Sequence, residues 1–278
     1  MRIISGTLFL VATPIGNLGD ISSRAAQTLS ETDFIAAEDT RVTQKLLAHL
    51  KIKKQLVSYH EHNRRESGEK IVSRILSGEK CALVSDAGTP GISDPGEELV
   101  RLCVEAGISI VAIPGPCAAV TALVLSGLPA GRFVFEGFLS TARKSRFERL
   151  RELKTEKRTM VFYEAPHKLT RTLSDMLAAF GDRKVSISRE LTKLYDETMR
   201  CTLSEAASYY KQNPPRGEFV LIIEGADDDH APEIDFSQAV KAAQSLIDEG
   251  FTIKDAVKAA AEDTGVPKNK IYNAVIKK

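Results

Sequence analysis

The sequence predicts an α/β fold, with two α/β domains and a small helical module after them. Short apolar runs alternate with amphipathic stretches over residues 1–116, and a second series of such runs begins near Gly131. An acidic stretch then precedes three short amphipathic segments. Alternation of this kind is typical of sheets covered by helices. The chain is therefore expected to divide into domains 1–118 and 119–225, a linker 226–235 and a module 236–278.

The first domain is expected to contain a mainly parallel sheet, because its apolar runs are short and are bounded by Gly, Pro, Asn and Asp. Strands are predicted at 7–12, 34–37, 55–59, 81–85 and 109–113, and helices at 22–31, 41–50, 66–77 and 96–106. Ligands bind beyond the carboxyl ends of strands in such sheets. A site is therefore expected in the loops 12–20, 85–96 and 113–120.

The second domain repeats the pattern of apolar runs separated by helical stretches. Strands are predicted at 132–138, 159–165, 184–190, 198–203 and 217–225, with helices at 142–156, 167–180 and 203–212. The stretch 226–235 has five acidic residues and no Lys or Arg, which favours a solvated linker. Glycine and proline separate three short amphipathic helices after it, at 236–250, 252–265 and 267–277.

Composition excludes several classes of protein. The 278 residues are 43% apolar and 27% charged, with a net charge of +1, which is typical of a globular chain and does not indicate its partners. Cys81, Cys103, Cys117 and Cys201 are far apart and form no CxxC pair, so buried thiols in a reducing compartment are expected. The start lacks the pattern of a signal peptide, and no apolar run reaches the ~20 residues of a membrane span. A cytoplasmic location is predicted.

The loop 85–96, SDAGTPGISDPG, combines three glycines with two aspartates and two prolines. Gly91 and Gly96 have the glycine spacing of a P-loop, but Glu97 and Glu98 follow where Lys and Ser or Thr are needed, and no GxGxxG occurs. Glycines permit close approach of the backbone to a ligand. The loop therefore suits a ligand with cationic groups, such as S-adenosylmethionine. The alternative is a plain turn in which Asp94 caps the next helix.

Five motifs together resemble those of a known family. They are TPIGNLGD, DAGTPGISDPG, PGPCA, YEAPHK and SRELTK, in this order. The set resembles the tetrapyrrole methylases, which use S-adenosylmethionine, and within them the branch that methylates the ribose 2′-hydroxyl of a cytidine in bacterial small-subunit (16S) ribosomal RNA. The resemblance extends from about Gly6 to Gly225. Cys117 stands where the family commonly has serine, and Lys168 where it commonly has arginine.

The resemblance implies a cofactor cleft between two α/β domains, a homodimer and a helix-turn-helix-like tail that docks on RNA. Backbone of residues 215–223 would face the adenine, and no metal is expected. Asp86 is the first choice for a cofactor contact, because it lies at a strand end and Gly88 follows closely. The full set of implied cofactor-binding residues is Pro14, Ile15, Asp86, Ala87, Gly88, Thr89, Pro114, Gly115, Pro116, Cys117, Ala118, Tyr163, Glu164 and Arg189.

No single general base can be identified from the sequence. A ribose hydroxyl must lose its proton during or after attack on the methyl group, which makes a nearby base useful. Asp39 and Glu190 are the main candidates, and Glu38, His60 and His62 are others. Each has a structural alternative, such as a helix cap for Asp39. Methyl transfer through aligned groups alone, without a protein base, also remains open.

Basic residues gather in three stretches that could contact RNA phosphates. Residues 141–158 hold eight basic and three acidic residues, and at helical spacing Arg143, Arg146 and Arg149 to Lys157 are predicted to form a basic face, with a solvated helix as the alternative. The other stretches contain Lys51, Lys53, Lys54, Arg64 and Arg65, and in the tail Lys254, Lys258, Lys268, Lys270, Lys277 and Lys278. Two other functions remain open: methylation of a tetrapyrrole carbon, and a regulator that senses S-adenosylmethionine without catalysis.

Overall fold

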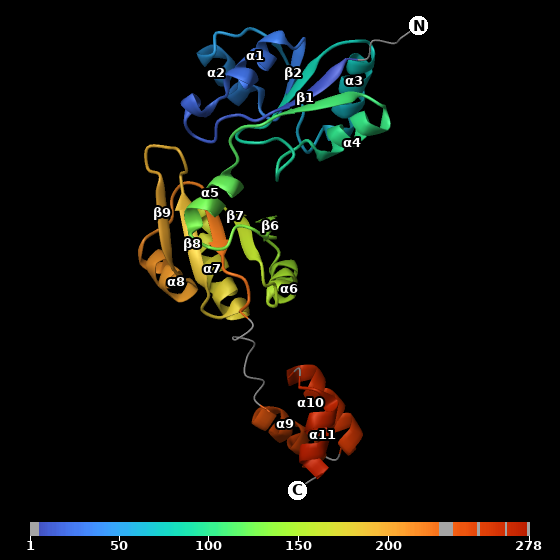
Figure 1. Ribbon diagram of the computed structural model, residues 1–278, viewed down its shortest axis with the longest axis vertical. Coiled ribbons are helices and arrows are strands. Elements are labelled where there is room, and N and C mark those ends of the chain that lie inside the picture. Colours follow the sequence, from blue (N-terminus) through green and yellow to red (C-terminus); the bar gives the residue numbers. More distant parts are fainter. Residues whose placement is uncertain (1–5, 228–235, 249–250, 265, 277–278) are drawn as a thin grey trace. The chain divides into compact units, whose positions relative to one another are not determined.

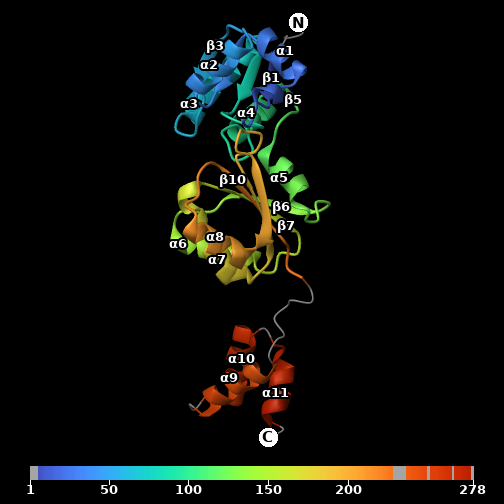
Figure 2. The ribbon, with the colours of Figure 1, turned by 90° about the vertical axis from the view of Figure 1, so that its left-hand side faces the viewer.

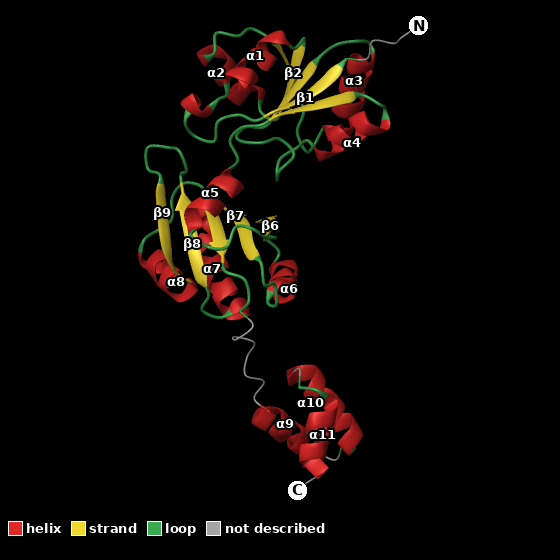
Figure 3. Ribbon diagram, in the orientation of Figure 1, coloured by secondary structure: helices red, strands yellow, loops and turns green. Residues whose placement is uncertain are grey.

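The computed structural model describes residues 6–227, 236–248, 251–264 and 266–276. The chain forms two compact units, Met1–Gly225 and Ala226–Lys278. The larger unit contains two five-stranded sheets, each with its own helices (Figure 1). Helices and strands alternate along both halves of this unit, as predicted from the sequence (Figure 3).

The first sheet is parallel throughout and has the strand order β3-β2-β4-β1-β5. Its strands are β1 Thr7–Val11, β2 Phe34–Ala37, β3 Gln55–Ser58, β4 Cys81–Val84 and β5 Ser109–Ile113. The predicted parallel sheet is confirmed, and the predicted strand bounds agree within one residue. Its central strands, β2 and β4, are buried along their whole length, as expected for a sheet covered on both faces.

Helices cover both faces of the first sheet. They are α1 Ser23–Glu31, α2 Thr40–His49, α3 Arg64–Leu76 and α4 Glu97–Glu105. Leu29 and Leu47 pack from α1 and α2 against one face, and Ile75 and Leu99 pack from α3 and α4 against the other. Side chains alternate between the two cores because successive residues of a strand point to opposite faces: Phe34 faces one core and Ile35 the other.

The second sheet is mixed, with the order β6-β7-β10-β8-β9. The central strand β10 pairs antiparallel with β7 and β8, whereas β6 and β7 are parallel. The strands are β6 Phe133–Phe138, β7 Thr159–Glu164, β8 Lys184–Arg189, β9 Glu197–Thr202 and β10 Phe219–Ile223. All five residues of β10 are buried, so this strand is the centre of the domain.

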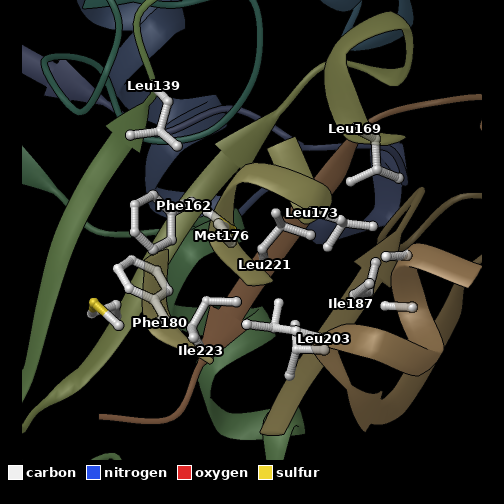
Figure 4. Close-up of a cluster of buried hydrophobic side chains, with 14 of the residues drawn as sticks. Leu139, Phe162, Leu169, Leu173, Met176, Phe180, Ile187, Leu203, Leu221 and Ile223 are labelled. Atoms are coloured by element: carbon white, nitrogen blue, oxygen red, sulfur yellow. The ribbon is translucent and has the colours of Figure 1, made fainter. Parts of the chain in front are cut away.

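Helices α6 Arg143–Leu153, α7 Pro166–Phe180 and α8 Leu203–Gln212 cover one face of the second sheet, and α5 Ala118–Ser126 covers the other (Figure 2). Figure 4 shows the larger core, in which Leu173 and Phe180 of α7 meet Phe162, Leu221 and Ile223 of the sheet. No bounds were predicted for α5. It begins at the position proposed to divide the two domains and packs on the second sheet through Ala119, Ala122 and Leu123.

The prediction of a basic face on α6 is wrong for Arg146. The Arg146 side chain is only 3% exposed and pairs with Asp175 of α7 at 2.8 Å. Arg149 donates to Glu136 of β6 and to Glu152. Arg146 lies on the side of the helix that meets the domain, because residues 146 and 150 share the buried face, whereas the Arg149 side chain is 48% exposed and is neutralised by its two glutamates. Arg143, Lys144 and Arg151 remain exposed.

The smaller unit contains α9 Phe236–Asp248, α10 Ile253–Thr264 and α11 Lys268–Ile276. Its core is made mostly of alanine and valine, with Ala239, Ala243, Val257, Ala260 and Ile271 among its buried members. The lysines at 254, 258, 268 and 270 are exposed. Lys277, Lys278 and residues 228–235 of the predicted linker 226–235 lie outside the described residues. Within the described part of the chain, no helix has the length and apolarity needed to cross a bilayer.

Candidate functional site

Two of the predicted loops join at the carboxyl ends of β1 and β4. Thr13 and Gly88 exchange a pair of backbone hydrogen bonds, with N···O distances of 2.9 and 3.0 Å. The Thr13 hydroxyl also donates to the Ser85 carbonyl at 3.3 Å. The loops 12–20 and 85–96, which are far apart in the sequence, therefore form one unit at the edge of the first sheet.

Gly88 gives this junction its shape. Its φ of +84° is in the region that favours glycine, and a Cβ there would lie 3.3 Å from Cγ2 of Ile15. The next residue, Thr89, donates from its hydroxyl to the carbonyl of Pro116 at 3.1 Å. The third predicted loop is thus tied to the same place, and a side chain at position 88 would disturb all three loops.

A cavity of about 380 Å³ lies between these loops and the second sheet. Its size is suited to a small-molecule ligand. Of the predicted cofactor-binding residues, it is lined by Ile15, Ala87, Gly88, Thr89, Cys117, Ala118, Tyr163 and Glu164. The sequence did not single out Ile92, Asp94, Phe138 and Leu191, which also line it. We call this space the cofactor cavity.

The charged side chains that line the cofactor cavity are all acidic. Asp94, Glu164 and Glu218 line it, and no Lys, Arg or His is among its described lining residues. Glu164 is buried, and its carboxylate accepts a hydrogen bond from the Thr172 hydroxyl at 2.6 Å and forms an ion pair with Lys168 at 3.6 Å. Such a cavity disfavours phosphate and suits a ligand with cationic groups. Lys168 thus makes an ion pair with Glu164 at the position where the family commonly has arginine.

Tyr163 connects the second sheet to helix α5. Its hydroxyl accepts a hydrogen bond from the Ala119 amide at 3.2 Å, and its ring packs edge-on against Phe135. Burial raises the pKa of Tyr163 to about 12, so the phenol stays protonated and can also donate into the cavity. Residues 218–220, within the stretch predicted to face adenine, line the same cavity.

Pro14 and Asp86 lie in a second cavity, of about 370 Å³, which shares Ile15, Ala87 and Glu218 with the first. The Asp86 carboxylate accepts a hydrogen bond from the Asp39 amide at 3.0 Å. Burial raises the pKa of Asp86, as it does that of the neighbouring Glu38. Asp86 therefore holds the loop after β2 and lies beside the cofactor cavity rather than in its lining.

Asp39 is placed as a helix cap. Its carboxylate accepts from the backbone amide of Arg41 at 2.8 Å and from the Arg41 guanidinium. These hydrogen bonds lower the pKa of Asp39 to about 2, with the side-chain bond as the largest cause. A carboxylate with so low a pKa is a weak base. The geometry thus favours the structural alternative for Asp39.

Glu190 is held inside the loop that follows β8. It has a φ of +50°, and its carboxylate accepts from the Glu218 amide at 2.9 Å and from Lys193 at 3.0 Å. Burial alone would raise its pKa, but these hydrogen bonds outweigh burial and lower it. A Cβ on Gly217 would lie 2.5 Å from Glu190, so the site is packed tightly. Glu190 stabilises this loop and does not line the cofactor cavity.

The remaining predicted residues do not line either cavity. Pro114, Gly115 and Pro116 carry the backbone that leads into α5, and a Cβ on Gly115 would lie 3.0 Å from the Ala12 Cβ. Arg189 pairs with Glu197 of β9 at 2.9 Å. His60 and His62 lie before α3 with their ring centroids 6.0 Å apart. None of these histidines lines the cofactor cavity.

Asp94 is a lining residue that the sequence did not single out, because within the predicted ligand-binding loop 85–96 its one individual interpretation was the alternative role of a helix cap. It lines the cofactor cavity, and the cap position of α4 belongs to Gly96. Burial, reinforced by the nearby Glu38, raises the pKa of Asp94 to about 6. Its position in the same glycine-rich loop as Gly88, two residues before the cap of the helix, could have indicated this role from the sequence.

Comparison with known proteins gives consistent matches. Residues 7–207 match the family of Tetrapyrrole (Corrin/Porphyrin) Methylases. The chain is 51% identical over 271 residues to a ribosomal RNA small subunit methyltransferase I of Halalkalibacterium halodurans, covering 96% of this chain and 94% of that protein. It is 47% identical to the protein of the same name from Synechocystis sp., with 96% of each chain covered.

A solved structure shares the fold. Uroporphyrin-III C-methyltransferase from Thermus thermophilus, in complex with S-adenosylhomocysteine, matches with a TM-score of 0.56 at 18% identity, over 79% of this chain and 97% of that one. The family match covers well over half of the present chain. The arrangement of two α/β domains, the shared motifs and these matches lead to one conclusion: the chain belongs to the tetrapyrrole methylase family.

Proposed function

We propose that this protein is an S-adenosylmethionine-dependent methyltransferase that methylates the ribose 2′-hydroxyl of a cytidine in small-subunit ribosomal RNA. The observation that carries the proposal is the cofactor cavity, which has carboxylates and backbone in its walls and no cation among its described lining residues. The relatives at 51% and 47% identity, named for methylation of this RNA, support the choice of substrate. A cytoplasmic location follows from that substrate.

The residues that line the cavity fit the donor molecule. Ile15, Phe138 and Leu191 offer apolar surface for the adenine and ribose, and Phe219 and Val220 of β10 also line the cavity. Asp94 places negative charge where a sulfonium or an amine is stabilised, whereas Glu218 is paired with Lys193 at 3.0 Å. Bound here, S-adenosylmethionine supplies an activated methyl group. The protein must then align an attacking oxygen opposite the sulfur, which itself provides a large part of the acceleration.

Exposed basic residues supply the contacts expected for RNA. Arg143, Lys144 and Arg151 are exposed on α6, and the smaller unit exposes lysines on α10 and α11. Arg64 and Arg65 are partly neutralised by Glu98 and Glu69, at 3.0 and 3.9 Å. Contacts with phosphates of this kind give affinity without base readout. We assign the smaller unit the role of a docking module for the ribosomal substrate.

Helix α5 supports a homodimer. Its buried residues face the second sheet, while Val120, Val124 and Leu125 on its other side are 50%, 68% and 39% exposed. Leu194 and Tyr195, in the turn between β8 and β9, are 87% and 69% exposed. An exposed group of large apolar side chains of this kind marks an interaction surface. A second copy of the chain is the partner that the family resemblance implies.

Val124→Glu is expected to weaken the dimer by at least about tenfold, because a carboxylate would be desolvated at the interface. The helix itself should be retained, since Glu is a better helix former than Val. Sedimentation velocity over a range of protein concentrations measures the effect. Val104→Glu, at a valine of α4 that is 64% exposed, is the matched control and should leave the dimer unchanged. Equal effects of the two variants would reject α5 as the interface.

Methylation of purified small subunits tests the proposed function. The protein should transfer labelled methyl groups from S-adenosylmethionine to a single cytidine, and nucleoside mass spectrometry should place each label on the ribose. Transfer to a tetrapyrrole carbon instead would favour the first alternative. Cofactor binding without transfer to either substrate would favour a sensor.

A chain ending at Gly225 should bind the cofactor normally but methylate limiting subunits slowly if the smaller unit is a docking module.

A further inference from the structure

Asp94 lies between two cavities. It lines the cofactor cavity and also a third cavity of about 300 Å³, whose lining includes Glu38, Tyr59, Arg64 and Ser93. The loop 85–96 thus places one carboxylate on the boundary between them. A donor in the first cavity and an acceptor in the third would therefore meet at Asp94. We call the third cavity the acceptor cavity.

The acceptor cavity has features that suit a polar ligand. Tyr59 is 1% exposed, and its hydroxyl has no hydrogen bond of normal geometry, although the Leu99 amide lies near it. A buried hydroxyl without a partner is costly, so a hydroxyl or carbonyl of a ligand would satisfy it. Arg64 is the cation among the described lining residues and is paired with Glu98 at 3.0 Å, and the other charged side chains of the lining are carboxylates. A ribose, whose hydroxyls can donate to carboxylates and accept from the Tyr59 hydroxyl, suits this lining.

Other carboxylates near the cofactor cavity are already engaged. Asp39 is paired with Arg41, Glu190 with Lys193, and Glu164 with Thr172 and Lys168. Asp94 has no ion pair among the described residues, and its side-chain partner is the Ser85 hydroxyl. Burial is the main reason that its pKa rises to about 6, and Glu38 and Asp86 add to the rise. A base with a pKa near the working pH accepts a proton more readily than an ordinary carboxylate and is still ionised at pH 7.

We propose that Asp94 is the general base that takes the proton from the ribose hydroxyl during methyl transfer, an inference that rests on the proposed function. As the hydroxyl oxygen attacks the methyl carbon, the O–C bond forms and the C–S bond breaks with its electrons left on sulfur. The proton passes to the Asp94 carboxylate and later to solvent. The products are a methyl ether and neutral S-adenosylhomocysteine, so charge and atoms balance without another reactant.

Asp94→Asn tests this role, because asparagine has nearly the same shape but cannot accept the proton. At saturating cofactor and subunits, the single-turnover rate of methylation should fall by about 100-fold or more, the range typical of acid-base catalysis. Cofactor affinity, measured by calorimetry, should fall by much less than the rate, because asparagine removes a negative charge beside the donor but leaves the rest of the cavity intact; the loss of rate should therefore persist at saturating cofactor. Asp227→Asn, at an exposed aspartate that lies outside the five motifs and lines none of the three cavities, should keep the full rate.

The pH dependence of the unaltered protein provides a second measurement that needs no variant. The single-turnover rate should rise about tenfold per pH unit below the pKa of Asp94 and level off above it, because only the ionised carboxylate accepts a proton. The plateau should begin between pH 6 and 7. The titratable and charged groups that face Asp94 from neighbouring elements are Glu38, Asp86, Tyr163, Glu61, Arg64, Glu97 and Glu98.

The outcomes separate this inference from the proposed function. If the unaltered protein does not methylate subunits, the proposed function fails. If it does, and Asp94→Asn keeps its single-turnover rate, or the rate keeps rising with pH beyond 8 without a plateau, Asp94 is not the base. A variant that loses only cofactor affinity and recovers the full rate at saturating cofactor would make Asp94 a binding residue and reject the inference equally.

Discussion

Gly88→Ala should lower the affinity for S-adenosylmethionine by about tenfold or more, which corresponds to about 1.4 kcal/mol of binding free energy. The φ of +84° at this position is unfavourable for alanine, and the new Cβ would lie 3.3 Å from Ile15 and 3.6 Å from the Pro116 carbonyl. Relief of both strains requires a shift of the loop that pairs with Thr13. That shift would change the walls of the cofactor cavity, which Gly88 and Ile15 both line.

Gly107→Ala is the matched control for this variant. Gly107 has a φ of +66°, and nothing lies within 4 Å of a Cβ built on it. Both variants should therefore lose about 1–2 kcal/mol of stability from the left-handed conformation, but only Gly88→Ala should lose cofactor affinity. Calorimetric titration of the two folded variants measures the difference. Equal cofactor affinity in both would remove the junction of Thr13 and Gly88 from the binding site.

The local pattern of apolar runs and turn residues in the sequence was sufficient to predict most of the fold. Buried strands such as β2 and β4 are continuous apolar runs with turn residues on both sides, so their bounds follow from the sequence. Parallel strands bring the loops that follow them to one edge of the sheet, and for this reason the pattern of strands predicts that the three loops lie together. The bounds of α5 were not predicted, because a helix apolar on nearly all sides shows no amphipathic period.

The candidate site could be predicted only in part, because a side chain's role depends on what surrounds it. Asp39 and Asp94 are both aspartates in the loop that follows a buried strand. Asp39 meets Arg41 and is held as a cap, whereas Asp94 meets other carboxylates and a cavity. Sequence spacing does not distinguish these surroundings. Glu190 is a similar case, since its partners Lys193 and Glu218 come together only when β8 and β10 pair.

The basic stretch 141–158 shows that a cluster of charged residues in the sequence also does not reveal which of them are exposed. Eight basic residues over eighteen positions favour an RNA-binding face, yet the helix must also bury one side against the domain. Arg146 falls on that buried side and pairs with Asp175 at 2.8 Å, and its guanidinium also donates to the carbonyls of Ser140 and Thr141. The exposed positions on α6 are the ones left for RNA.

Asp175→Ala is expected to lower the free energy of unfolding by about 3 kcal/mol, the low end of the range for removing one partner of a buried ion pair. Arg146 is 3% exposed, so its charge would remain buried with only the two carbonyls as partners. The low end applies because Asp175 itself is 16% exposed, which lets some water replace it. Chemical denaturation measures the change.

Glu148→Ala separates this effect from general damage to helix α6. Glu148 pairs with Lys144 at 3.9 Å, and the two side chains are 55% and 90% exposed, so the control should cost less than about 0.5 kcal/mol. A loss of similar size in both variants would mean that the Arg146 pair contributes no more than a surface contact. The arginine would then be free to leave Asp175 and reach the RNA, as the sequence pattern predicts. A sixfold difference between the variants, about 3 against about 0.5 kcal/mol, would instead assign Arg146 to the packing of α6 on α7.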